Sequence, residues 1–271
     1  MSDRYAVFGN PVVQSKSPMI HARFAAECGQ DLTYEKIEAP VDGFADALHA
    51  FIETGGKGCN VTAPFKLDAF ALATDMTEDA RLAGSTNTLR FSDGLIEAHN
   101  TDGIGLLRDI ENNLGMPLRG KRVLMLGAGG AVRGALLPFL QAGPAEFSLL
   151  NRSADKAAAL RDMMAAHGAI TLCDPEKSHG FDIVLNGTSS SLSGACPPLP
   201  EGLFEGCALA YDLTYGKGLT PFLKNAEAAG VGRLSDGVGM LVEQAAEAFA
   251  WWRGVKPGTR DLITQMTVPL A

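Results

Sequence analysis

Disulfide bridges and metal clusters have little support in this sequence of 271 residues. Its five cysteines are an odd number, and no two of them have the C-x-x-C spacing of a zinc ribbon. Reduced thiols in a cytoplasmic protein are the simpler interpretation. The five histidines form neither an H-x-x-x-H nor an H-E-x-x-H pattern, so we expect no metal site.

Long apolar runs and an excess of positive charge are also missing. No apolar stretch reaches membrane-spanning length, and no charged and then apolar leader precedes Tyr5. The formal net charge is -8, which disfavours nucleic acid or an anionic membrane surface as a partner. We therefore expect a soluble cytoplasmic protein, monomer or homodimer, that binds a small molecule. Any bound anion must be held by a local basic cluster.

Glycine, by contrast, is plentiful, and apolar runs alternate with helical patterns. The chain has 31 glycines and 7% aromatic residues, a composition that suits packed α/β layers with tight turns. We expect strands at 5–9, 33–38, 58–62, 88–91, 95–98, 123–126, 147–150, 182–185 and 208–211, and helices at 19–28, 44–51, 131–141, 153–166, 222–229 and 240–252. Strands alternating with helices imply parallel sheets, whereas Ser92-Asp-Gly94 indicates one hairpin.

The pattern changes to a cleaner βαβ rhythm after Asp102. We expect two α/β domains, the C-terminal one a Rossmann-type doubly wound parallel sheet, with a deep interdomain cleft. The first would comprise residues 1–102 plus 237–271 and the second residues 103–236. A cleft between two such domains is a natural place for a ligand.

A glycine-rich turn follows the expected strand at 123–126 and begins the next helix. It reads Gly127-Ala-Gly-Gly130-Ala-Val-Arg133-Gly134. A helix N-terminus offers free N–H groups to a pyrophosphate, and glycine lets the backbone approach the phosphates. A simple tight turn is the alternative. Val132 stands where the usual fingerprint has glycine or alanine, so we expect slightly looser packing of helix on strand there.

The end of the next strand carries cations where NAD-binding units commonly carry an acid. Asn151, Arg152 and Ser153 stand there, and Lys156 follows one turn later. A guanidinium pairs well with a ribose 2′-phosphate, so this cluster favours NADP over NAD. The plainer interpretation is a helix cap at Ser153 beside a solvated arginine, and both can hold together.

Polar side chains also follow strands in the N-terminal region. Ser15 and Ser17 precede a helix, where a small anion would meet two hydroxyls and free N–H groups, although Ser17 alone is a plain N-cap candidate. Asn60 and Thr62 alternate onto one side of a strand and precede Lys66. Asn87 adds an amide, and Asp102 brings a carboxylate to the domain junction, where it could also merely cap a helix.

These segments, in this order and spacing, resemble the shikimate dehydrogenase family along nearly the whole chain. The matching stretches are Gly9-Asn-Pro11, Ser15-Lys-Ser-Pro18, Asn60-Val-Thr-Ala-Pro-Phe-Lys66, Asn87-Thr88, Asn100-Thr-Asp-Gly-Ile-Gly105, Gly127-Ala-Gly-Gly130, Asn151-Arg152, Asn186-Gly-Thr-Ser189, Tyr215, Thr220-Pro-Phe-Leu223, Asp236-Gly-Val-Gly-Met-Leu241 and Gln244. Such a series of motifs is far more specific than any one of them. Two departures are Gln14, where the family often has histidine, and Ala63, where it usually has a branched aliphatic residue.

The resemblance implies an NADP-dependent oxidoreductase that reversibly reduces 3-dehydroshikimate to shikimate in chorismate and aromatic amino acid biosynthesis. It implies that the first domain binds substrate and the second binds NADP. Catalysis would belong to Lys66 and Asp102. The implied substrate-binding residues are Ser15, Ser17, Asn60, Thr62, Asn87, Tyr215 and Gln244. The implied cofactor-binding residues are Gly127, Gly129, Gly130, Ala131, Asn151, Arg152, Ser153, Lys156, Thr188, Leu213, Gly237 and Met240.

In the implied mechanism, the Lys66 ammonium stabilises the growing charge on the carbonyl oxygen and supplies the proton, and Asp102 holds the lysine. We expect these two groups to face each other across the gap between the domains. Whether Lys66 alone or the pair moves the proton stays open. Three alternatives also remain: a quinate/shikimate dehydrogenase, an aminoshikimate relative, and a non-catalytic NADP-binding sensor on the same fold.

Overall fold

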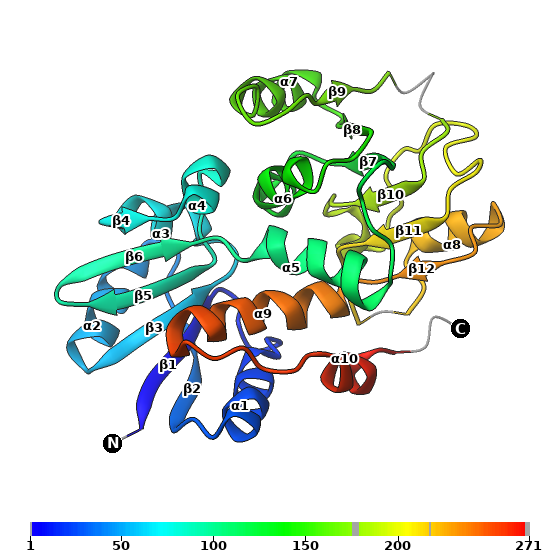
Figure 1. Cartoon of the computed structure of the whole chain (residues 1–271). Coiled ribbons are helices and arrows are strands. Elements are labelled where there is room, and N and C mark those ends of the chain that lie inside the picture. Colours follow the sequence, from blue (N-terminus) through cyan, green and yellow to red (C-terminus); the bar gives the residue numbers. More distant parts are fainter. Residues whose placement is uncertain (1, 175–178, 217, 269–271) are drawn as a thin grey trace. The chain divides into compact units, whose positions relative to one another are not determined.

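The chain forms two compact units in a computed structural model that describes residues 2–174, 179–216 and 218–268. The first unit takes in the chain up to Gly105 together with Val242–Leu262, and the second takes in Leu106–Leu241 and the residues from Ile263 onward. The chain passes between them within α5 (Asp102–Arg108) and again within α9 (Val238–Arg253), both labelled in Figure 1. The last helix, α10 (Arg260–Met266), begins in the first unit and ends in the second, so the chain passes between the units a third time there.

The first unit is built on a mixed sheet with the strand order β2-β1-β3-β5-β6-β4. Its strands are β1 (Asp3–Gly9), β2 (Leu32–Glu38), β3 (Gly56–Val61), β4 (Asp75–Met76), β5 (Thr88–Ser92) and β6 (Leu95–His99). The pairings β1–β2, β1–β3 and β4–β6 are parallel, and β3–β5 and β5–β6 are antiparallel. Asp93 and Gly94 both have positive φ, as a two-residue hairpin turn requires, and the expected hairpin is confirmed.

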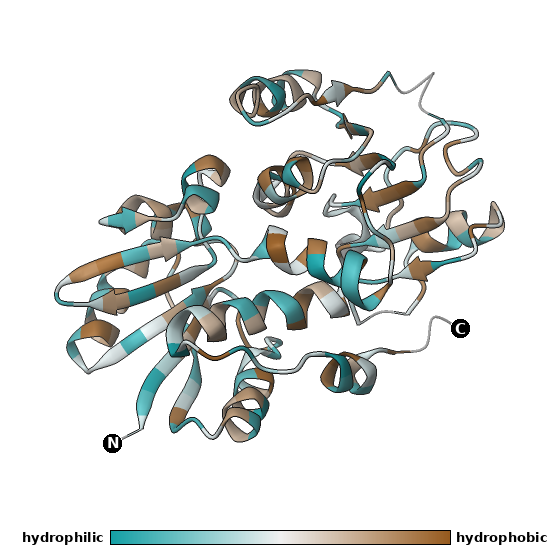
Figure 2. Ribbon diagram, viewed as in Figure 1, coloured by the Kyte–Doolittle hydropathy of each residue, from teal (hydrophilic) through white to brown (hydrophobic). Residues whose placement is uncertain are grey.

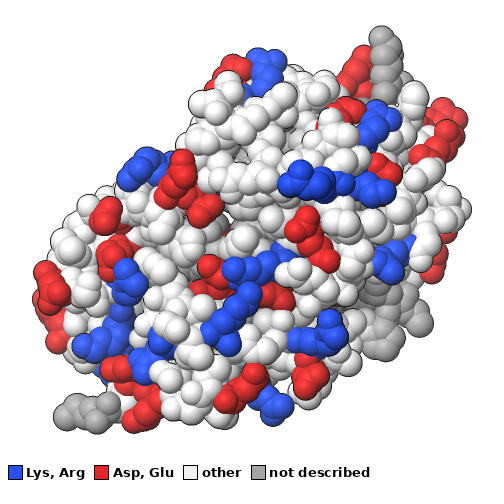
Figure 3. Space-filling model, in the orientation of Figure 1, with Lys and Arg blue, Asp and Glu red and all other residues white. Residues whose placement is uncertain are grey.

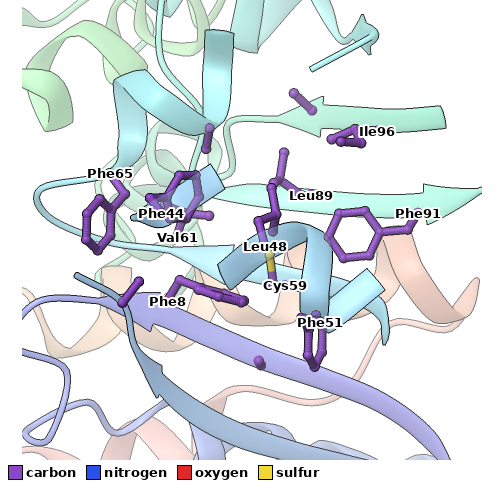
Figure 4. Packing of buried hydrophobic residues seen from close by; sticks show 14 of the residues in the cluster. Phe8, Phe44, Leu48, Phe51, Cys59, Val61, Phe65, Leu89, Phe91 and Ile96 are labelled. Atoms are coloured by element: carbon purple, nitrogen blue, oxygen red, sulfur yellow. The ribbon is translucent and has the colours of Figure 1, made fainter. Parts of the chain in front are cut away.

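Four helices belong wholly to the first unit: α1 (Ser17–Cys28), α2 (Phe44–Glu53), α3 (Lys66–Leu72) and α4 (Glu78–Ala83). The side chains of α2 and α3 form a core with one face of the sheet, which Figure 4 shows from close by. In this core Phe44 stacks on Phe65 with ring centroids 4.8 Å apart. A second aromatic cluster joins α1 to α9, where Phe24 meets Phe249 edge to face at 5.8 Å. Buried aromatic pairs of this kind fix the helices on the sheet.

The second unit is built on a wholly parallel sheet with the order β12-β11-β10-β7-β8-β9. The strands are β7 (Arg122–Leu126), β8 (Glu146–Leu150), β9 (Thr171–Leu172), β10 (Ile183–Asn186), β11 (Leu209–Asp212) and β12 (Leu234–Ser235). Counted from β7, this is the 3-2-1-4-5-6 order of a doubly wound fold, so the expected Rossmann-type sheet is confirmed. Strand β10 is buried along its length and brown in Figure 2, as parallel strands covered on both faces usually are.

The helices of the second unit lie on both sides of its sheet, with α6 (Gly130–Gln141) and α7 (Ala154–Met163) on one side and α8 (Pro221–Ala228) on the other (Figure 1). A π-helical turn, Asp109–Asn113, continues α5, and a 3₁₀ turn spans Ser190–Ser193. Ligands of such sheets bind where the strand order reverses, beyond the carboxyl ends of the two central strands. Here those strands are β7 and β10.

Packing at Val132 is closer than the sequence led us to expect. Val132 is fully buried on α6. A Cβ added to Gly187, just after β10, would come within 2.5 Å of the Val132 Cγ2 atom. The prediction of looser packing is therefore wrong, because the bare backbone of Gly187 makes room for the larger side chain at 132.

The surface carries both signs of charge, and Figure 3 shows basic and acidic side chains interspersed on the face in view. Within residues 2–174, 179–216 and 218–268, no helix is both long and apolar enough to span a bilayer. The same residues contain no group of three or more His, Cys, Asp or Glu side chains that could hold a metal ion.

Gly239 on α9 is expected to tolerate no side chain. A Cβ there would overlap the carboxylate of Asp109, which is buried and accepts hydrogen bonds from the Tyr211 hydroxyl at 2.8 Å and the Asn113 amide at 3.0 Å. Gly239→Ala gains about 1 kcal/mol of helix propensity, but overpacking and a displaced buried carboxylate together cost more. We expect the free energy of unfolding to fall by about 2 kcal/mol or more in urea titrations.

Gly232→Ala is the matched control for that measurement. A Cβ at Gly232 would have no heavy atom within 4 Å, and the residue does not have positive φ. Its free energy of unfolding should stay within about 0.5 kcal/mol of the wild-type value. Equal stability of the two variants would contradict the argument for Gly239.

Candidate functional site

Lys66 and Asp102 form an ion pair within the first unit. The Lys66 Nζ donates to Asp102 Oδ2 at 2.5 Å, and the two side chains are 26% and 9% exposed. Lys66 begins α3, just after β3, and Asp102 begins α5, just after β6. Our expectation that the pair spans the gap between the domains is wrong, because both residues belong to the unit that extends to Gly105. A lysine ammonium has three N–H bonds, so the bond to Asp102 leaves two that can be donated to a ligand.

Asn87 connects this pair to two further polar side chains. Its Nδ2 donates to Asp102 Oδ1 at 2.8 Å, to Thr101 Oγ1 at 3.0 Å and to Gln244 Oε1 at 3.2 Å. Its Oδ1 accepts from the Thr101 N–H at 2.9 Å. The structure thus brings four residues singled out from the sequence, Lys66, Asn87, Asp102 and Gln244, into one network. Both carboxylate oxygens of Asp102 are hydrogen-bonded, which fixes the orientation of that group.

Gly105 allows α5 to pack against α9 at the point where Gln244 joins the network. A Cβ at Gly105 would come within 2.6 Å of the Gln244 backbone nitrogen. Thr101, at the centre of the network, was not singled out from the sequence. Its place between Asn100 and Asp102 in a motif rich in polar residues was the one available signal.

Ser15 and Ser17 also meet, at the start of α1. The Ser15 Oγ donates to the Ser17 Oγ at 3.2 Å and accepts from the Ser17 N–H at 3.3 Å. Lys16, not Ser17, occupies the N-cap position, and no side chain caps this helix end. The plain N-cap interpretation of Ser17 is therefore wrong, because Ser17 is the first helical residue.

The side chains of Asn60 and Thr62 have different surroundings. Asn60 is buried on β3, and its side chain is hydrogen-bonded to Tyr34, His21, Thr88 and the Asn87 carbonyl. Strand β3 ends at Val61, so strand alternation does not determine the direction of the Thr62 side chain. Instead, the Thr62 N–H donates to the Phe8 carbonyl at 2.9 Å, and its Cγ2 lies against Gly9, where a Cβ would come within 2.6 Å of it.

Tyr215 lies in the second unit, beyond β11, and is 39% exposed. It is thus the one expected substrate-binding residue outside the first unit. The other expected residues of the second unit gather near the ends of its strands. Thr188 donates to Asn186 Oδ1 at 2.7 Å, the Gly237 N–H donates to the Thr214 carbonyl at 3.2 Å, and the Met240 N–H donates to the Tyr211 hydroxyl at 3.3 Å.

Close backbone approach explains Gly237, since a Cβ there would overlap the Leu213 carbonyl. A buried carboxylate, Asp212, supports these loops and was not singled out from the sequence. It accepts from Ser191 and Thr220 at 2.6 Å each and from Asn186 at 3.1 Å.

The glycine turn after β7 has the features that a dinucleotide needs. Gly127 has a φ of 109°, and a Cβ there would lie 3.1 Å from the Gly187 carbonyl. Cβ atoms at Gly129 and Gly130 would meet nothing within 4 Å, so this stretch of backbone is open. Helix α6 begins at Gly130 without a side-chain cap, and its first N–H groups are therefore available to an anion. Ala131 is half-buried in the first turn of this helix.

One buried polar atom near this turn has no partner. The Nε of Arg133, in the first turn of α6, is buried and makes no hydrogen bond within the described residues. A buried donor without a partner is costly, and a bound phosphate group would satisfy it. Together with the open glycines, this orphaned donor fits the pyrophosphate of a dinucleotide.

The cationic cluster after β8 is exposed and unpaired. No hydrogen bond or ion pair involves the side chains of Arg152 or Lys156 within residues 2–174, 179–216 and 218–268. Asn151 donates to the Ser153 carbonyl at 2.9 Å, which holds the loop. Ser153 occupies the N-cap position of α7, although its side chain makes no capping bond. Two free cations at the end of the second strand are what a 2′-phosphate would need.

Comparison with known proteins gives the family. Residues 7–89 match the shikimate dehydrogenase substrate binding domain, and residues 237–265 match the shikimate 5′-dehydrogenase C-terminal domain. The NADP(+)-dependent shikimate dehydrogenase of Nitrosospira multiformis is 53% identical over 265 residues, which are 97% of this chain and 96% of that protein. The chain belongs to the shikimate dehydrogenase family.

Solved structures of similar proteins agree with this assignment to the shikimate dehydrogenase family. An Ael1 enzyme from Pseudomonas putida has 57% identity and a TM-score of 0.96, with all of both chains covered. The Thermus thermophilus shikimate 5-dehydrogenase, solved in complex with NADP(H) and shikimate, has 30% identity and a TM-score of 0.87, covering 97% of this chain and 99% of that one. The resemblance seen in the sequence is therefore confirmed at the level of family and of fold.

Proposed function

We propose that this protein is an NADP-dependent oxidoreductase that interconverts 3-dehydroshikimate and shikimate. The observation that carries the proposal is the Lys66–Asp102 ion pair, fixed by Asn87, in a member of the shikimate dehydrogenase family. Such a pair offers an ammonium to a carbonyl oxygen and a carboxylate that orients it. The proposed pathway is aromatic amino acid biosynthesis through chorismate, in the cytoplasm, by a monomer or homodimer.

Lys66 is the proposed catalytic acid for reduction and the base for oxidation. Its ammonium has N–H bonds to spare beside the one given to Asp102, and it is partly exposed. A positioned proton donor stabilises negative charge on the carbonyl oxygen and delivers the proton there. Asp102 holds the ammonium in place and accepts a hydrogen bond from a neighbouring substrate hydroxyl.

The remaining polar groups of the first unit are proposed to hold the substrate. Ser15 and Ser17 offer two hydroxyls to its carboxylate, with Tyr215 as a further contact. Asn87, Gln244 and Thr62 are proposed to bind hydroxyl groups, and Asn60 completes the site. We therefore assign residues 1–102 plus 237–271 to substrate binding.

The second domain, residues 103–236, is proposed to bind the cofactor, and the second unit, which continues to Leu241, adds Gly237 and Met240. NADPH supplies the hydride when it is bound there, and no metal is required for that chemistry. Gly127, Gly129, Gly130 and Ala131 would hold the pyrophosphate on the N-terminus of α6. The 2′-phosphate would be held by Asn151, Arg152, Ser153 and Lys156, and the nicotinamide would lie near Thr188, Leu213, Gly237 and Met240.

A four-way assay of the purified protein tests this function. Shikimate and quinate are each paired with NADP⁺ and NAD⁺, and absorbance at about 340 nm is followed as the reduced cofactor forms. We expect kcat/KM to be highest for shikimate with NADP⁺. A higher value with quinate would favour the quinate/shikimate alternative, and an amino analogue of shikimate tests the third substrate class. NADP⁺ binding without turnover of any of these acids would favour a sensor.

A further inference from the structure

The side chain of Asn60 has one possible orientation, and its neighbours fix it. One end of its amide faces the Asn87 backbone carbonyl at 3.2 Å and the Thr88 Oγ1 at 3.0 Å. A carbonyl oxygen only accepts hydrogen bonds, so the end that faces it must be the Nδ2 amide nitrogen. The Oδ1 atom of Asn60 therefore points the other way, toward Tyr34 and His21.

Tyr34 and His21 must both act as donors to that oxygen. The Tyr34 hydroxyl lies 2.7 Å from Asn60 Oδ1, and the His21 Nε2 lies 3.2 Å from it. His21 must then carry its proton on Nε2, and its Nδ1, which has no partner among the described residues, is the bare nitrogen of that tautomer. His21 is 0% exposed, and this burial lowers its pKa to about 3, so the ring is neutral at physiological pH.

The two donor rings are themselves held rigidly. His21 stacks on Tyr34 with ring centroids 4.3 Å apart and an interplanar angle of 6°. His21 also contacts Phe24, Phe249 and Trp252 from α1 and α9. Burial raises the pKa of Tyr34 well above its usual value, which keeps the hydroxyl protonated as a donor. A side chain locked by packing positions its hydrogen-bonding group better than a free one.

All the hydrogen-bonding capacity of the Asn60 side chain is used inside the protein. Two donors occupy Oδ1 and two acceptors occupy Nδ2, and the residue is 6% exposed. A direct bond from Asn60 to a substrate would have to displace one of these four. Asn60 instead reaches the site through the backbone carbonyl of Asn87, whose side chain holds Asp102.

We propose that His21 and Tyr34 are positioning residues for the dehydrogenase reaction, which lock the Asn60 amide so that Asn60 in turn holds Asn87 and the Lys66–Asp102 pair. This inference rests on the proposed function and deepens it. It also changes the role of Asn60, which supports the substrate-binding groups and does not bind the substrate itself.

Removing the Tyr34 hydroxyl is the sharpest test, because Tyr34→Phe keeps the ring stacked on His21. We expect kcat/KM for shikimate to fall about threefold to tenfold, the effect of one lost hydrogen bond in a rigid network, with the KM of NADP⁺ unchanged. His21→Phe should have a similar effect, and His21→Gln, which keeps a donor, should recover most of it. The matched control is Tyr5→Phe, which removes a hydroxyl that accepts from Arg253 in the same unit.

A double-mutant cycle with Asn60→Ala distinguishes positioning from general destabilisation. If Tyr34 and His21 act through Asn60, adding Tyr34→Phe or His21→Phe to Asn60→Ala should change kcat/KM by less than about twofold. Effects that multiply fully in the double variants would overturn the proposal. So would a Tyr34→Phe variant as active as wild type, while an inactive wild-type protein would instead count against the proposed function.

The tautomer of His21 gives a readout that does not depend on activity. In ¹⁵N NMR spectra of histidine-labelled protein, we expect His21 to be neutral and protonated on Nε2 from about pH 5 to pH 9. A His21→Phe sample assigns the signal. A ring protonated on Nδ1, or one that titrates in this range, would overturn the proposal even if the enzyme proved to act on another acid.

Discussion

Lys66→Ala is expected to lower kcat for shikimate oxidation by about 100-fold to 10,000-fold, with a change in KM of severalfold at most. The ammonium that donates to Asp102 at 2.5 Å is the one group of this network that we assign to proton transfer. Its loss removes stabilisation that exists only in the transition state, and such a loss is seen in kcat and not in KM. Steady-state kinetics with shikimate varied at saturating NADP⁺ give both constants.

Lys57→Ala is the matched control for the catalytic lysine. Lys57 is an exposed residue on β3, the strand that leads to Lys66, and it makes no ion pair in the part of the chain that the structure describes. Its removal should leave kcat within about twofold of wild type. If Lys66→Ala raised KM and left kcat unchanged, Lys66 would be a binding residue, and the proton would have to be moved by another group.

The parts of the fold that were predicted correctly are those whose local sequence pattern is clear. The buried strands of the second unit are short apolar runs that end at a glycine, asparagine or aspartate, and β7, β8, β10 and β11 were predicted to within about two residues. Gly127 to Gly130 predicted the turn after β7 because the positive φ and open backbone there favour glycine. The hairpin was predicted because Asp93-Gly94 supplies both left-handed residues.

Short elements without a periodic signal were missed. Strands β4, β9 and β12 have two residues each, and α4 has six, too few to give a clear hydrophobic period. Helix α7 ends at Met163 and not at Ala166, because the chain turns toward Gly168 although alanines continue the helical composition. Propensity alone does not contain the tertiary contacts that end a helix.

Contacts between distant residues limited what could be predicted of the candidate site. The residues Asn87, Asp102 and Gln244 were singled out by motif, but only the structure shows that one amide nitrogen of Asn87 reaches both of the others. Nothing in the local sequence of His21 or Tyr34 indicates that both point at Asn60, since 39 and 26 residues separate them from it. Lys66 and Asp102 were predicted correctly as a pair and were both assigned to the first domain, but they were expected to face each other across the gap between the domains, whereas both lie within one unit.

The two candidate sites also differ in whether their polar side chains already have hydrogen-bond partners within the protein. In the first unit the polar groups satisfy one another, and a substrate would meet groups that are already oriented. In the second unit, Arg152 and Lys156 are exposed and have no partner among the described residues. Exposed cations on an otherwise acidic protein stay solvated and cost little stability, and they attract a phosphate from solution. The choice between cofactors should therefore depend on these two side chains.

Arg152→Asp is accordingly expected to raise the KM and Kd of NADP⁺ by about 10-fold to 100-fold, because charge-assisted hydrogen bonds to the 2′-phosphate are lost and a repulsive carboxylate replaces them. The constants for NAD⁺, which lacks that phosphate, should change by less than about threefold. The matched control is Arg161→Asp, the same change of charge at an exposed residue in the last turn of α7, the helix that follows Arg152. Among the described residues Arg161 pairs with its neighbour Asp162. Binding titrations with each cofactor give Kd without turnover.

If Arg152→Asp weakened the binding of NADP⁺ and of NAD⁺ equally, this arginine would bind a part common to both cofactors. The preference for NADP would then have to come from other residues.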